Sequence, residues 1–239
     1  MTQNIRANLE AVHERVVRAC ERAGRKPNDV LLIAVSKTVE VERIRLAVAA
    51  GVQSLGENRV QEAKEKVAAL GRPVPWHLIG SLQTNKARDA VQLFDWIHSV
   101  DREDLARELD RRAHQHERRV KILVQVNIGE EPQKGGVHPA ELTRLLEVMA
   151  GLPNLDVRGL MCIPPVEEAA EASRPWFKRL RDLRDAARLD HCSMGMSGDF
   201  EVAIEEGATM VRVGTSIFGP RQGPAGSSQG PSRPRETRA

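Results

Sequence analysis

The chain has 239 residues, and its 36 lysines and arginines nearly balance its 33 aspartates and glutamates to give a net charge of +3. Because both signs are interleaved along most of the chain, it presents no sustained basic face of the kind that binds nucleic acid. It contains no run of about 20 apolar residues, so the sequence predicts no membrane span. Three isolated cysteines, Cys20, Cys162 and Cys192, lack the spacing of a metal site or a disulfide framework. They fit a reducing compartment, and we expect a cytoplasmic protein.

The length suits a single large domain, because barrels and doubly wound domains of about 200 to 250 residues are common. We expect residues 1–221 to form this domain. Residues 222–239 consist mainly of Gly, Pro, Ser and Arg and contain no large apolar side chain. This composition predicts a disordered tail. Its arginines could contact an acidic partner, although solvated charge is the simpler interpretation.

Strand and helix patterns alternate along the chain. A first amphipathic helix is predicted over residues 5–23. Apolar runs then predict eight strands, at 30–35, 54–56, 76–80, 96–100, 121–127, 156–161, 191–195 and 210–213. Helical spacing lies between them at 42–50, 59–70, 102–114, 140–149 and 167–188. The alternation predicts a (β/α)₈ barrel with an additional N-terminal helix; a doubly wound sheet is the alternative, and the strand count favours the barrel.

A lysine follows the first predicted strand. The run from Val30 to Val35 is rich in β-branched residues, which is typical of a buried parallel strand, and Ser36-Lys37-Thr38 comes directly after it. Residues at the carboxyl ends of barrel strands line the ligand site. A lysine partly removed from water loses basicity and can attack a carbonyl to form a Schiff base. Lys37 is therefore a candidate for amine chemistry, with a solvated strand-end lysine as the alternative.

Other polar or small residues also follow predicted strands. In a barrel the residues after each strand face one end, so they should converge although they are far apart in sequence. We expect this of Lys37, Glu57, Asn58, Ser81, Asn127, Met161, Cys162, Ser197 and Thr215. His77 lies within a predicted strand, and we interpret it as a structural hydrogen-bonding residue.

The last two predicted strands each end in a turn of small residues. Ser193 to Asp199 and Val211 to Thr215 both lead into short helical patterns. Small residues let backbone N–H groups approach an anion, and Ser197 and Thr215 add hydroxyl groups. The two turns predict a phosphate-binding cup. Simple capping of the following helices is the alternative for both residues, and the two roles are compatible.

Arg212 lies within the last predicted strand. Its side chain alternates with those of Val211 and Val213 and should face the barrel interior or its mouth. A buried guanidinium needs a partner, which could be a carboxylate such as Glu57 or Asp199. Together with a Schiff-base lysine and a phosphate cup, however, Arg212 completes the groups that bind pyridoxal phosphate.

Six segments in order carry a family resemblance. They are residues 32–38, 56–62, 76–86, 159–161, 193–197 and 211–219. Over residues 4–221 the chain resembles the pyridoxal phosphate homeostasis proteins, which are single-domain relatives of the barrel half of alanine racemase. The resemblance implies that Lys37 holds the cofactor as a Schiff base and that Arg212 faces its pyridine nitrogen. It further implies that the phosphate is bound by Ser197, Gly214 and Thr215, that Asn58 lies beside the ring and that Met161 packs nearby.

The resemblance also implies a function. Such a protein binds pyridoxal phosphate reversibly, limits the free aldehyde and delivers the cofactor to enzymes that need it, without robust turnover. Alanine racemase requires a second acid/base, a tyrosine from another domain of the partner subunit, and this chain contains no tyrosine. Arg212 stays protonated and leaves the pyridine nitrogen uncharged, which weakens carbanion chemistry. Because the racemase dimer is built largely with the domain that is missing here, we expect a monomer.

Two enzyme readings remain open at this point. The first is a low-activity amino-acid racemase or another enzyme dependent on pyridoxal phosphate. The second is an aldolase-type barrel in which Lys37 attacks a phosphorylated carbonyl substrate directly. Metal chemistry finds little support, because His114 and His116 are two residues apart on a predicted helix and face different directions.

Overall fold

The computed structural model describes residues 4–220, in which eight parallel strands form a closed barrel in sequence order. The strands are β1 (Leu31–Val35), β2 (Leu55–Glu57), β3 (Trp76–Leu78), β4 (Trp96–Val100), β5 (Val120–Gln125), β6 (Leu155–Met161), β7 (His191–Met196) and β8 (Met210–Val213). Strand β8 pairs with β1, from Met210 beside Leu31 to Val213 beside Ala34, so the sheet closes on itself. The predicted (β/α)₈ barrel is confirmed over the doubly wound sheet. Arg221 and the predicted tail, residues 222–239, lie outside the described residues.

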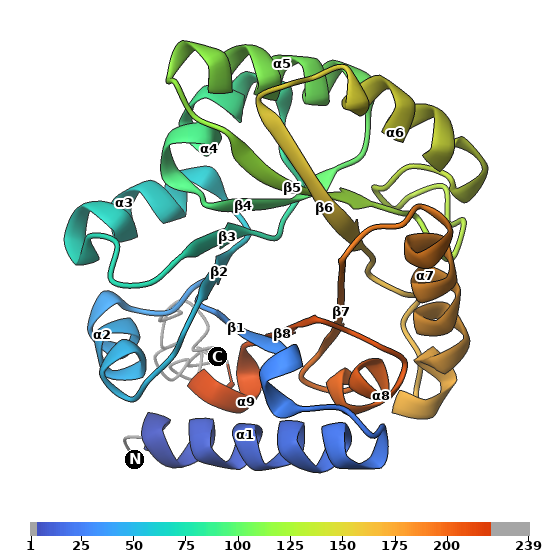
Figure 1. Cartoon of the computed structure of the whole chain (residues 1–239). Coiled ribbons are helices and arrows are strands. Elements are labelled where there is room, and N and C mark those ends of the chain that lie inside the picture. The colour runs from blue at the N-terminus through green and yellow to red at the C-terminus, as the bar shows by residue number, and fades with distance from the viewer. Residues whose placement is uncertain (1–3, 221–239) are drawn as a thin grey trace, which may run out of the picture.

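Helices surround the barrel on its outer face (Figure 1). They are α1 (Ile5–Arg22), α2 (Val41–Ala49), α3 (Val60–Leu70), α4 (Ala87–Leu93), α5 (Glu103–Gln115), α6 (Leu142–Ala150), α7 (Arg174–Ala186), α8 (Phe200–Glu205) and α9 (Thr215–Phe218). Short 3₁₀ helices occupy Pro27–Asp29, Thr84–Lys86, Pro139–Glu141 and Ala170–Ser173.

Two helical segments differ from the prediction. Helix α4 was not predicted, because its seven residues make barely two turns and give little periodicity. The helix predicted over 167–188 is shorter in the structure, since α7 begins only at Arg174. Pro175 lies in its first turn, where a residue without an N–H is tolerated and its fixed φ favours a helix start.

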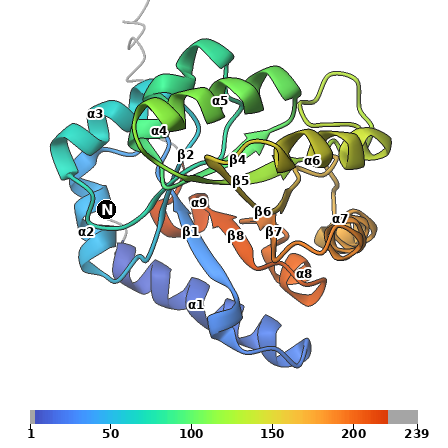
Figure 2. The same ribbon diagram turned by 45° about the horizontal axis from the view of Figure 1, so that its top comes forward.

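The additional N-terminal helix is present. Helix α1 buries Leu9, Val12 and Val16 along one face. It lies against α8, α9 and α2, as both Figure 1 and Figure 2 show. Helices α8 and α9 have only six and four residues. Helix α1 therefore completes the outer layer where the helices after the last two strands are short.

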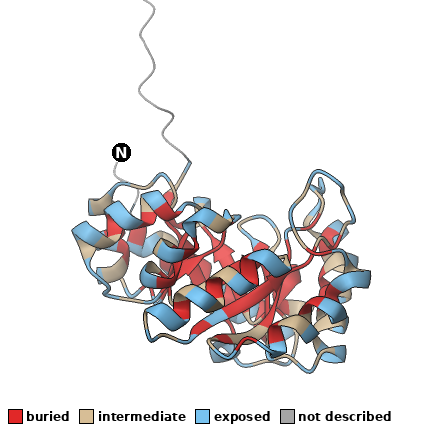
Figure 3. Cartoon of the chain, turned by 90° about the horizontal axis from the view of Figure 1, so that it is seen from above, coloured by how far each residue is buried: buried red, intermediate tan, exposed pale blue. Residues whose placement is uncertain are grey.

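The core has two parts. The larger lies between the strands and the inward faces of the helices, where Figure 3 shows buried positions along both. The smaller fills the barrel interior with Ile33, Leu123, Met161 and Met210. Polar side chains, among them Arg212, Ser193 and His98, also lie in the interior. Within residues 4–220, no helix is long and apolar enough to cross a membrane.

Candidate functional site

The predicted site residues come together at one end of the barrel. Lys37 lies two residues after β1, Asn58 follows β2, Ser197 follows β7, and Gly214 and Thr215 follow β8. All strands are parallel, so these residues lie at the same end, and β7, β8, β1 and β2 are consecutive neighbours. The last residue of β6 is Met161, which is fully buried in the interior cluster. One side of the barrel mouth thus carries Lys37, Asn58, Ser197, Gly214 and Thr215, whereas Met161 lies in the interior.

Gly214 connects the end of β8 with the end of β1. A Cβ atom built on Gly214 would lie 3.2 Å from the carbonyl oxygen of Val35 and 3.3 Å from its Cβ. The backbone of the predicted phosphate turn therefore contacts β1 just before Lys37. Lys37 itself is half-buried, and Ser36 before it is fully buried. The glycine brings the lysine and the turn together.

Glu57 does not face the mouth, contrary to the prediction for the residues that follow strands. It is the last residue of β2 and is fully buried. Its Oε1 lies 2.7 Å from Nζ of Lys66 on α3. Alternation along β2 explains the difference, because Gly56 faces the interior and its neighbours face outward. Asn127 is also engaged elsewhere, since its side chain donates to the carbonyl of Glu131 within its own loop.

Arg212 faces the barrel interior as predicted, but its partners differ from those expected. Nη1 donates to Oγ of Ser193 at 2.8 Å, and Nη2 donates to the carbonyl oxygen of Cys162 at 2.9 Å. Among the described residues no carboxylate forms an ion pair with Arg212, so the suggested pairs with Glu57 and Asp199 are wrong. Glu57 instead forms an ion pair with Lys66. Burial lowers the pKa of the Arg212 guanidinium.

A chain of polar side chains continues from Arg212 through the interior. Ser193 Oγ lies 3.0 Å from Nδ1 of His98, whose Nε2 lies 2.9 Å from Nδ1 of His77. The His77 ring stacks on Trp96. Burial lowers the pKa of His77 to about 3 and that of His98 well below its usual value, so both are neutral at pH 7.

The interior chain supports the structural interpretation of His77, but His98 was missed. A signal for it existed in the sequence. Trp96 and His98 alternate along a strand with Ile97, which indicates that their two side chains lie on the same face of the sheet. The pattern could not show which face of the strand lies toward the barrel interior and which lies toward the helices.

The two predicted phosphate turns do not cap their helices through Ser197 and Thr215. Asp199 occupies the N-cap position of α8, and Gly214 occupies that of α9. The Asp199 carboxylate accepts a hydrogen bond from the backbone N–H of Met196 at 2.6 Å and so closes the first turn. Ser197 is half-buried and Thr215 is exposed. These two hydroxyl groups therefore do not cap the helices that follow them.

A pocket of about 310 Å³ adjoins the first turn. Met196, Gly198 and Asp199 line it from the turn, and Ile163 and Val166 line it from the loop after β6. The apolar side chains of Ile163, Val166 and Met196 are exposed there. Within residues 4–220, no group of three histidine, cysteine or acidic side chains could hold a metal ion.

The chain is similar in sequence to a known protein family. Residues 6–222 match the family described as the N-terminal domain of alanine racemase. The chain is 49% identical to the pyridoxal phosphate homeostasis protein of Aquifex aeolicus over 221 residues, which cover 90% of this chain and 97% of that relative. The relative of the same name from Pseudomonas aeruginosa is 44% identical over 220 residues, covering 91% and 96%.

Solved structures extend the comparison. PipY of Synechococcus elongatus, determined with PLP bound, superposes with a TM-score of 0.77 at 42% identity, covering 86% of this chain and 100% of PipY. Alanine racemase of Clostridium difficile superposes with a TM-score of 0.69 at 17% identity, covering 90% of this chain but 56% of the racemase, a likeness of fold alone. With its barrel and this level of identity over nearly its whole length, the chain belongs to the pyridoxal phosphate homeostasis protein family.

Proposed function

We propose that this protein binds pyridoxal phosphate at the mouth of its barrel and acts as a carrier of that cofactor. The observation that carries the proposal is the convergence of Lys37, the turns at Ser197 and at Gly214 and Thr215, and Arg212 at one end of the barrel. A relative that is 42% identical over 86% of the chain was solved with PLP bound, which supports the choice of ligand.

The residues fit the three functional parts of the cofactor. The amine of Lys37 is suited to the aldehyde, and the two turns offer backbone N–H groups and hydroxyls to the phosphate. The guanidinium of Arg212 is buried and held by Ser193 and Cys162 without a carboxylate among the described residues, so its charge is available to a ring nitrogen. The contact between Gly214 and Val35 brings the phosphate turn beside β1.

Each residue has a distinct task in holding the cofactor. Bound pyridoxal phosphate supplies a reactive aldehyde and an electron-withdrawing ring. Lys37 forms a Schiff base with the aldehyde and retains the ligand covalently but reversibly. Arg212 donates a hydrogen bond to the pyridine nitrogen and keeps that nitrogen unprotonated, because a guanidinium does not give up its own proton. The ring is then a poor electron sink, which favours storage over turnover.

The proposed role is cofactor homeostasis without robust catalysis. The chain contains no tyrosine that could serve as the second acid/base of a racemase. We further propose a cytoplasmic monomer that releases the cofactor to apoenzymes dependent on it. Sedimentation at low micromolar concentration should give the mass of one chain, and a stable dimer would contradict this part of the proposal.

The decisive experiment is an absorbance titration with pyridoxal phosphate. The wild-type protein should develop a Schiff-base band at one cofactor per chain, and borohydride reduction should remove the band and leave the cofactor covalently attached. Lys37→Ala should show neither the band nor the borohydride-trapped adduct, because the amine that forms the Schiff base is removed. Lys178→Ala is the matched control, since Lys178 is an exposed lysine on α7.

The alternatives give different outcomes in the same titration. A band that Lys37→Ala leaves intact would contradict the site assignment. No band in either protein would favour an aldolase-type barrel. Turnover of an amino acid that greatly exceeds that of free cofactor, and that Lys37→Ala abolishes, would favour a racemase-type enzyme over a carrier.

A further inference from the structure

A buried ion network lies directly behind the turn that carries Lys37. Lys66 on α3 is only 5% exposed. Its Nζ lies 2.7 Å from Glu57 Oε1, 2.7 Å from Glu62 Oε1 and 2.6 Å from the carbonyl oxygen of Ser36. We infer that Glu57, Glu62 and Lys66, here called the lysine clamp, are positioning residues that hold Lys37 in its binding geometry. This inference rests on the proposed function.

The clamp fixes the residue before Lys37. Ser36 Oγ donates to Glu57 Oε1 at 2.6 Å, and its carbonyl oxygen accepts from Lys66 at 2.6 Å. Its backbone N–H donates to the carbonyl of Gly56 at 2.9 Å. All the polar groups of Ser36 are therefore engaged, and its position is tied both to β2 and to α3.

The clamp also fixes the residue after Lys37. Thr38 has a φ of 61°, in the left-handed region that a β-branched residue rarely adopts. Such a conformation persists only where neighbouring groups enforce it. Its backbone N–H donates to Glu62 Oε1 at 2.5 Å. Glu62 thus joins the strained residue to Lys66, and through Lys66 to Ser36.

Stability alone does not explain this arrangement. Removing two charges from water costs several kcal/mol per ion, so a buried ion pair commonly adds little net stability compared with apolar side chains. Glu57 Oε2 is buried and has no hydrogen-bond partner among the described residues, which adds to the cost. Apart from their bond to each other, the described hydrogen bonds of the Glu57 and Lys66 side chains all go to Ser36 or to Glu62, the partner of Thr38. The network is arranged around the turn that presents Lys37.

The test removes the link to Thr38 and spares the buried pair. The Glu62 side chain is 25% exposed, so Glu62→Ala should fold, and Lys66 keeps Glu57 and Ser36 as partners. We expect cofactor binding about tenfold weaker, with faster hydrogen exchange of the Thr38 amide in the cofactor-free protein. Glu62→Gln should restore both, because its carbonyl oxygen can accept the Thr38 N–H.

The matched control is Glu108→Ala on α5. Glu108 is 20% exposed and also pairs within its helix, with Arg111 and Arg112, but it does not touch the turn. It should leave both readouts unchanged. The inference requires both effects in Glu62→Ala and neither in the control. If the wild-type protein binds the cofactor and Glu62→Ala binds it equally well, the lysine clamp is wrong and the proposed function stands. If the wild-type protein shows no Lys37-dependent band, the proposed function itself is wrong.

Discussion

Single glycines decide how closely the backbones approach at the mouth. A Cβ atom on Gly80 would lie 2.3 Å from the carbonyl oxygen of Asn58, a distance that only a shift of the chain could relieve. At Gly214 the contact with Val35 is tight rather than impossible. The sequence shows Gly80 two residues after β3 and Gly214 directly after β8, but the reason for each glycine appears only when the neighbouring strand is in place.

Gly214→Ala should weaken cofactor binding by about tenfold while the barrel still folds. The added methyl must displace Val35, and a shift of a few tenths of an ångström there moves the start of the Lys37 turn. The measurement is the absorbance titration, accompanied by thermal unfolding. Gly151→Ala is the control, since its nearest atom would be at an ordinary 3.5 Å and it follows α6, away from the site. Equal binding by the two variants would contradict the prediction.

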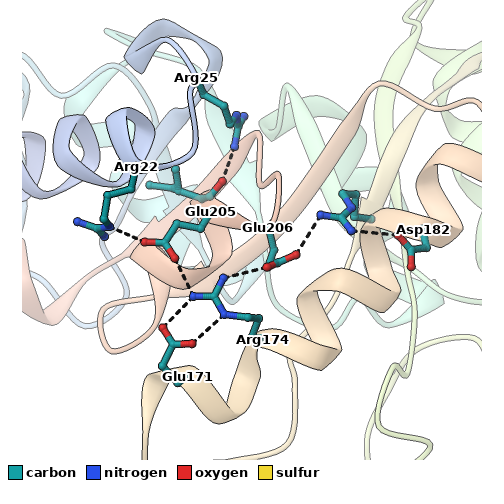
Figure 4. A network of polar contacts seen from close by, with 9 residues as sticks. Arg22, Arg25, Glu171, Arg174, Asp182, Glu205 and Glu206 are labelled. Carbon is teal, nitrogen blue, oxygen red and sulfur yellow. Dashed lines mark hydrogen bonds and ion pairs between the residues drawn. The ribbon is translucent and has the colours of Figure 1, made fainter.

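At the scale of elements, an ion network connects α1, α7 and α8 on the outside of the barrel (Figure 4). Arg174 at the start of α7 bonds Glu205 at 2.7 Å, Glu206 at 2.8 Å and Glu171 at 2.8 Å. Glu205 also accepts from Arg22 at the end of α1. The network therefore anchors the additional helix to the last part of the barrel, where α8 is short.

Removing the centre of this network should destabilise the fold modestly. We expect Arg174→Ala to lower the free energy of unfolding by about 1 kcal/mol, because the arginine is partly exposed and such pairs are screened by water. Urea unfolding measures the change, which should shrink in 1 M salt. Arg111→Ala, whose partner lies in the same helix, should have a smaller effect. A loss that salt leaves unchanged would rule out an electrostatic origin.

At the scale of the whole molecule, the barrel interior is both packed and polar. One part holds the apolar cluster around Ile33 and Met161, and another holds the chain from His77 through His98 and Ser193 to Arg212. Both histidines are fully buried. Because the folded state keeps them neutral, the stability of the whole barrel is coupled to pH.

The cofactor-free protein should lose stability as the pH falls below 6.5. The pKa of His77 is lowered to about 3 and that of His98 is also lowered, so between pH 6.5 and about 3 the unfolded chain binds more protons than the folded one. Unfolding free energy should then fall by up to about 1.4 kcal/mol per pH unit for each histidine. Burial raises the pKa of Glu57, which acts in the opposite direction.

Urea unfolding at pH 7.5, 6.0 and 5.0 measures this slope. His77→Gln should show a shallower slope than the wild type, because one of the two neutral histidines is gone. An identical slope in both proteins would mean that the buried histidines are not its source.

The sequence by itself determined the barrel, the additional helix and the set of strand-end residues, because apolar periodicity and strand ends are local properties of the chain. Only the tertiary structure decided which side chains contact one another. Glu57 points to Lys66 instead of the mouth, and Arg212 bonds Ser193 and Cys162 instead of a carboxylate. These partners depend on strand facing, register and burial, which arise when distant segments pack and which no local pattern encodes.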